Sequence, residues 1–72
     1  MTAARYEIVV RGRLGSALMT WFADLEVRSS GPDATYLYGW FADQSALQGL
    51  LSQLGELGVE LTSLRRLPDR GG

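Results

Sequence analysis

Cysteine, histidine, lysine and asparagine are all missing from this sequence of 72 residues. Without cysteine the chain has no disulfide, no thiolate zinc site and no thiol nucleophile. Without histidine it has no imidazole base and no imidazole metal ligand, and without lysine it has no Schiff-base amine. The carboxylates that remain are scattered rather than grouped in one loop. We therefore expect neither a metal ion nor a cofactor.

Strong charge of either sign is also missing. Seven arginines are balanced by eight acidic residues, which gives a net charge of −1 and a pI of about 5.1. Nothing in this balance favours electrostatic capture of nucleic acid or of an anionic membrane. No apolar run approaches the roughly 20 residues of a membrane span, and the N-terminus lacks the apolar region of a signal peptide. The expectation is a soluble cytoplasmic protein.

The small size bounds the stability of the fold. A single core in a chain this short rarely supplies more than roughly 3–5 kcal/mol, and proteins of this size often add disulfides, a metal ion or a partner. Disulfides and thiolate metal sites are excluded here. Oligomerisation or a partner protein is then the expected supplement.

Hydrophobic patterning predicts a βαββαβ order of elements. Asp43 is a good N-cap for the longer helix, Gly58 a good stop, and Ser16 is placed to cap the shorter helix. A Ser-Ser-Gly-Pro-Asp turn over 29–33 predicts a hairpin between the second and third strands. The predicted strands are 5–11, 25–28, 34–41 and 59–66, and the predicted helices are 16–23 and 44–57.

This order predicts an α+β ferredoxin-like fold: a four-stranded antiparallel sheet with both helices on one face. The first and third strands should then be central. We expect one domain over residues 1–72, with an ordered core at 5–67 and a flexible tail at 68–72.

The most informative segment is TYLYGWF, in which Tyr36, Tyr38 and Trp40 fall on alternate positions and therefore on one face of a strand. Leu37 and Phe41 take the other face, which we assign to the helices, with a glycine between them that leaves room for a helix. The aromatic side chains would present about 450–750 Å², against about 300–600 Å² for the largest patch of an ordinary monomer. We therefore expect a partner to cover them. The reverse orientation, with the aromatics in the core, remains an alternative.

The same argument assigns residues of the other strands. Ile8, Val10, Val59 and Leu61 are expected on the helix side, and the open face is expected to be edged by Glu7, Arg11, Glu26, Arg28 and Arg66. The predicted interface consists of Val9, Arg11, Tyr36, Tyr38, Trp40 and Leu64.

A second hypothesis concerns the loop before the first helix. The segment RGRLGSAL at 11–18 resembles the glycine-bearing loop and helix start of ACT-like domains. That resemblance implies a sensor of an amino acid or an aromatic metabolite at a dimer interface, because free N–H groups at a helix start attract a carboxylate. Its binding residues would be Arg11, Gly12, Arg13, Gly15 and Ser16.

Other resemblances leave further alternatives open. Tyr38-Gly39-Trp40-Phe41 resembles the core of the motif with which RNA-recognition modules stack bases. The topology also resembles small dimeric oxygenases and cyclases of secondary metabolism. The segments DQSALQGLL, LGVEL and RRLP are similar to parts of short ferredoxin-like proteins of high-GC bacteria, which carry no assigned activity. Our leading hypothesis is a non-enzymatic interaction or regulatory module, a homodimer or one docked on a larger protein.

Overall fold

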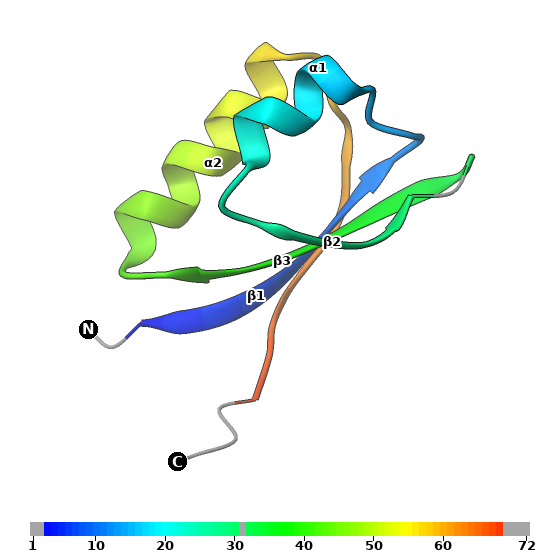
Figure 1. Cartoon of the computed structure of the whole chain (residues 1–72). Helices are drawn as coiled ribbons and strands as arrows, with labels where there is room; N and C mark the ends of the chain where they lie inside the picture. The colour runs from blue at the N-terminus through cyan, green and yellow to red at the C-terminus, as the bar shows by residue number, and fades with distance from the viewer. Residues whose placement is uncertain (1–2, 31, 69–72) are drawn as a thin grey trace.

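The chain forms one antiparallel sheet with its helices on a single face, as a computed structural model describes for residues 3–30 and 32–68 (Figure 1). The strand order is β2-β3-β1-β4, so β1 and β3 are central, as predicted. This is a ferredoxin-like α+β fold. The elements are β1 (Ala4–Arg11), α1 (Ser16–Met19), the 3₁₀ turn η1 (Thr20–Phe22), β2 (Glu26–Ser30), β3 (Ala34–Phe41), α2 (Gln44–Glu56) and β4 (Leu61–Arg66).

The core lies between the sheet and the helices. Opposite residues of an antiparallel pair share a face, and the register pairs Ile8 with Leu37. Both are fully buried, together with Leu54 of α2. Phe41 is also buried whereas Trp40 is 63% exposed, so the alternative that placed the aromatic triplet in the core is wrong.

Helix α2 begins at the predicted residue and ends one residue before the predicted end. The Asp43 side chain accepts a hydrogen bond from the Ala46 amide at 2.9 Å, which confirms the predicted N-cap. At the other end Gly58 has φ +75°, and Val59 donates its amide to the Leu54 carbonyl at 2.9 Å. This is a Schellman motif, and it explains why β4 begins at Leu61 rather than at the predicted position 59.

The first helix is shorter than predicted. It makes a single α-helical turn and continues as η1 to Phe22, which is buried. Gly15 occupies the N-cap without a side-chain hydrogen bond, and Ser16 is the first helical residue. The prediction that Ser16 caps this helix is therefore wrong, because the chain enters the helical conformation one residue earlier.

Gly39 makes room for a side chain rather than for a helix. A Cβ built at this position would collide with the end of the Leu25 side chain, which comes from the segment between η1 and β2. A larger residue at position 39 would displace the end of the Leu25 side chain, which packs against the core.

The hairpin between β2 and β3 has a shorter turn than predicted. β2 extends to Ser30, two residues beyond its predicted end, which shortens the predicted turn. Gly31 of that turn lies outside the described residues, as does the predicted flexible tail beyond Pro68.

Candidate interaction surface

The sheet has a second face, opposite the helices, which we call the outer face. The register places Glu7 of β1 opposite Tyr38 of β3 and Arg65 of β4, and it places Glu26 of β2 opposite Tyr38. Alternation then assigns the remaining members of this face. The outer face includes Arg5, Glu7, Val9, Arg11, Glu26, Arg28, Tyr36, Tyr38, Trp40, Ser63 and Arg65.

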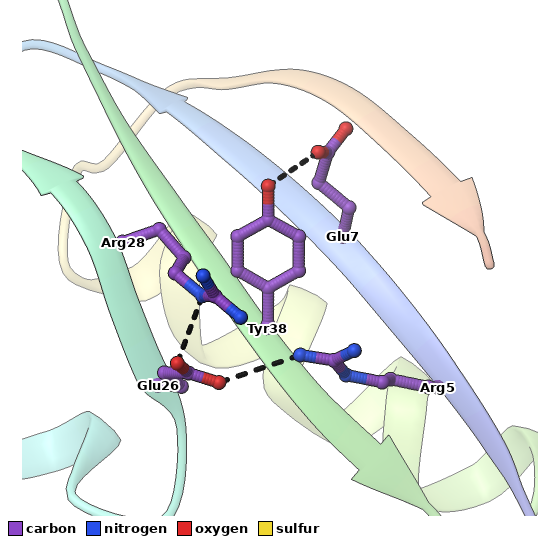
Figure 2. Close-up of polar contacts among 5 residues, drawn as sticks. All are labelled: Arg5, Glu7, Glu26, Arg28 and Tyr38. Atoms are coloured by element: carbon purple, nitrogen blue, oxygen red, sulfur yellow. Dashed lines mark hydrogen bonds and ion pairs between the residues drawn. The ribbon is translucent and has the colours of Figure 1, made fainter.

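Tyr38 lies at the centre of a polar network on this face (Figure 2). Its hydroxyl donates a hydrogen bond to Oε2 of Glu7 at 2.7 Å. The guanidinium groups of Arg5 and Arg28 lie over its ring, with Cζ at 5.4 Å and 5.6 Å from the ring centre. These are cation–π distances, and the two arginines reach Tyr38 from the strands on either side of β3.

Glu26 connects the two arginines. Its Oε1 lies 3.3 Å from Nη2 of Arg5, and its Oε2 lies 2.8 Å from Nε of Arg28. Exposed ion pairs contribute about 0–1 kcal/mol each, so this network orients the side chains more than it stabilises the fold. A bulge contributes to the arrangement, because Arg28 is the extra residue where the β2–β3 register shifts.

Glu7 is the best protected charge of the network. Its side chain is 13% exposed, and Nη2 of Arg65 lies 3.5 Å from Oε1. The hydrogen bond to Glu7 raises the pKa of Tyr38, and burial and the negative charge of Glu7 raise it further, whereas Arg28 and Arg65 oppose the change.

The exposed aromatic surface is smaller than predicted. Trp40 is 63% exposed and Tyr36 is 37% exposed, but Tyr38 is half-buried within the network. Val9, predicted as an interface residue, lies on the outer face but is only 8% exposed. It therefore forms part of the floor under its neighbours. The outer face is a charged and aromatic surface with two accessible rings, rather than a continuous apolar patch.

The prediction that Leu64 lies on this face is wrong. Leu64 is opposite Ile8 and Leu61 is opposite Val10, so both point to the helix side. Thr62 is an extra residue between them at a bulge, and one extra residue reverses the alternation. For the same reason Arg65, and not the predicted Arg66, reaches the outer face. No local signal in the sequence marks this bulge.

The predicted ligand loop is only partly assembled. The Gly12 amide donates a hydrogen bond to the Asp33 carbonyl at 3.0 Å, and the Gly12 carbonyl accepts one from the Thr35 hydroxyl at 2.8 Å. Both backbone polar groups of Gly12 are therefore already bonded within the protein. Arg11, also predicted at the interface, lies 3.6 Å from Glu60 in an exposed ion pair.

Two of the loop residues do meet at a hollow. A volume of about 320 Å³ lies between the end of β1, α1 and residues 57–60, which connect α2 to β4. Arg11 and Arg13 both line it, whereas Gly12, Gly15 and Ser16 do not. The other lining residues are Leu14, Leu18, Leu57, Gly58, Val59 and Glu60.

A second groove brings Trp40, a predicted interface residue, together with residues of the helix layer. Trp21, which is 59% exposed, and Trp40 both line a groove of about 290 Å³ beside α2. Asp24 and Gln53 supply polar groups to it.

Among residues 3–30 and 32–68, no three acidic side chains come together in a way that could hold a metal ion. Within the same residues, no helix has both the length and the apolar character needed to cross a membrane.

Comparison with known proteins gives a family. The chain belongs to the family described as "Domain of unknown function (DUF8691)", whose model matches residues 5–65. No curated protein and no solved structure matches the chain.

Proposed function

We propose that this member of the DUF8691 family is a non-enzymatic interaction module that docks on a partner protein, a second copy or a larger protein, through its outer face. The observation that carries the proposal is the position of Trp40. It is 63% exposed on the same sheet face as Tyr36, and no helix in the described part of the chain covers that face.

The composition of the outer face supports a protein partner. Tryptophan, tyrosine and arginine are the residues that most often dominate binding energy at protein interfaces. Here Trp40 and Tyr36 lie on either side of Tyr38 along β3, and guanidinium and carboxylate groups are held around Tyr38 by a hydrogen bond and ion pairs. Ordered charges of both signs provide electrostatic complementarity, which gives a partner its register and orientation.

The same network favours a protein over RNA. Base stacking needs an accessible ring face, but Arg5 and Arg28 lie over the ring of Tyr38. The cations are themselves engaged with Glu26, which reduces the positive charge available to phosphates.

The test compares the two exposed tryptophans. The full chain carrying Trp40→Ala should lose capture of its partner from an extract of the native host, while Trp21→Ala should retain it. Trp21 has nearly the same exposure, at 59%, but comes from η1 on the helix side of the groove that it shares with Trp40, so loss of capture in both variants would place the contact in that groove rather than on the outer face. Equal capture by both variants would contradict the proposal.

Fluorescence then locates the contact directly. In a Trp21→Phe variant the emission comes from Trp40 alone, and it should shift to the blue when the captured partner is added. In a Trp40→Phe variant the emission of Trp21 should shift less, because Trp21 lies on the helix side of the groove that the two residues share. A shift in the second variant only would place the contact on the helix layer instead.

A second candidate function is favoured by the hollow beside the first helix. Its apolar floor and the guanidinium of Arg13 fit a small carboxylate with an apolar side chain, as in the sensor hypothesis. A thermal-shift screen against amino acids and aromatic metabolites tests this. A ligand at 100 times its dissociation constant should add about 2.7 kcal/mol, and Arg13→Ala should abolish the shift. No shift with any compound would contradict this candidate.

A further inference from the structure

We infer that the groove lined by Trp21 and Trp40 binds an organic cation whose charged end is a guanidinium group. The groove has a volume of about 290 Å³, close to the roughly 300 Å³ at which ligand pockets begin. The inference needs no partner protein, so it goes beyond the proposed function and is tested separately from it.

The groove lies where β3 has lost one of its neighbouring strands. β2 begins at Glu26, which is opposite Tyr38, so within the described residues no strand pairs with β3 on that side at Trp40. Trp40 comes from the end of β3, whereas Trp21 comes from η1 in the helix layer. Two indole side chains, 63% and 59% exposed, therefore line one groove from two different layers.

The charge at the groove has a single sign. Among the described residues that line it, Asp24 alone is ionised, and no described arginine forms an ion pair with Asp24. Glu7, Glu26 and Glu60, by contrast, each have an arginine as a partner. A carboxylate without a counterion and the electron-rich faces of indole rings both attract a cation. This combination selects a cationic ligand.

The polar groups of the groove select a guanidinium over a quaternary ammonium. The two oxygens of Asp24 match two parallel N–H groups of one guanidinium. The half-buried Gln53 side chain makes no hydrogen bond with the described residues, so its carbonyl oxygen can accept a further N–H. A planar guanidinium also stacks on aromatic rings. A quaternary ammonium has no N–H and would leave both acceptors without a donor.

The remaining lining of the groove suits an alkyl chain. Phe22 and Phe41 are buried and form its floor, and Leu25 and Leu50 are half-buried. Methylene groups laid against these carbons remove apolar surface from water on both sides of the contact. The ligand class is therefore an alkylguanidinium, either a free metabolite or the side chain of an arginine in a peptide.

Titration with two compounds tests the inference and separates these two sources. Butylguanidinium represents the free metabolite, and N-acetyl-arginine methylamide represents arginine in a peptide. The tighter binder of the two identifies the source. Tryptophan fluorescence of the full chain should change saturably, and the neutral urea analogue of each compound should bind at least about tenfold more weakly. No saturable change, or equal binding of the urea analogues or of tetramethylammonium, would overturn the inference.

Variants with matched charge changes locate the site. Asp24→Asn should raise the dissociation constant at least about tenfold, whereas Glu56→Gln removes the same charge outside the groove and should leave it unchanged. Circular dichroism should show the fold of Asp24→Asn intact, because Asp24 is exposed and outside the core. Gln53→Glu adds a second carboxylate to the groove and should tighten binding several-fold, a gain that unfolding cannot produce. Equal effects of Asp24→Asn and Glu56→Gln, or no gain with Gln53→Glu, would contradict the site.

Single-tryptophan variants show which rings meet the cation. The emission of Trp40 in Trp21→Phe and that of Trp21 in Trp40→Phe should both respond to the bound guanidinium compound. A response from Trp40 alone would place the cation on the outer face and overturn the inference. Capture of a partner from the host extract decides the proposed function without any of these compounds, so either proposal can fail while the other stands.

Discussion

The hydroxyl group of Tyr38 gives the sharpest test of how the outer face is held. Tyr38→Phe keeps the ring between Arg5 and Arg28 but removes the donor of the 2.7 Å hydrogen bond to Glu7. Glu7 then remains as a carboxylate whose side chain is only 13% exposed. The variant therefore isolates one hydrogen bond to a largely buried charge.

The expected cost follows from that burial. Hydrogen bonds to charged groups contribute about 1.5–3 kcal/mol, and loss of one partner leaves the other desolvated. Arg65, at 3.5 Å from Glu7, compensates in part, so we expect a loss of about 1–2 kcal/mol. For a domain of this size each 1 kcal/mol lowers Tm by about 4–8 °C. A small core supplies roughly 3–5 kcal/mol in total, so the loss is a large fraction of the stability.

Denaturant unfolding and a thermal melt measure this loss, with Tyr36→Phe as the matched control. Tyr36 lies on the same face, but its hydroxyl is not part of the network, so its removal should cost less than about 0.5 kcal/mol. A double-mutant cycle of Tyr38→Phe with Glu7→Gln should show a coupling energy of about 1 kcal/mol. If Tyr38→Phe and Tyr36→Phe unfold alike, the reasoning is refuted.

Three further predictions follow from the same structure. The pKa of Tyr38 lies above the ordinary value of 10.0 in the folded chain, so its stabilising contribution is present below that pH and is lost as the pH rises through the folded pKa; alkaline melts should show this loss, and Tyr38→Phe should not. Gly39→Ala should cost about 1–3 kcal/mol in denaturant unfolding because its methyl group meets Leu25, and Leu25→Ala in the same chain should recover part of that cost; additive losses would contradict the contact. Asp43→Ala should cost about 1 kcal/mol because the Ala46 amide loses its acceptor, whereas Asp43→Asn should cost little.

Much of the fold could be predicted from local chemistry. The cap at Asp43 and the stop at Gly58 act within a few residues, and each appears where the sequence indicates. The alternation of Leu37 and Phe41 against Trp40 also assigned the faces of β3 correctly. Burial of apolar side chains on one face is strong enough to set the register of a central strand.

The errors have a common physical origin. Leu64 was misplaced because Thr62 forms a bulge against Val9 and Val10, and a bulge depends on the partner strand rather than on the bulged sequence. Val59 was wrongly assigned to a strand. Its amide is instead bonded to the Leu54 carbonyl in a Schellman motif, and this contact depends on where the preceding helix ends. The exposed aromatic area expected on β3 was too large, because that expectation left out the side chains of the adjacent strands that cover part of the rings.

The sequence alone therefore determined the order of elements, the faces of the central strand and the exclusion of thiol, imidazole and amine chemistry. Only the tertiary structure decided what those faces present. Arg5 and Arg28 are 23 residues apart, and Glu7 and Tyr38 are 31 apart, yet pairing of β1, β2 and β3 brings all four side chains together. Periodicity within a strand reports which side a residue takes, but the cross-strand register decides which charges cover it.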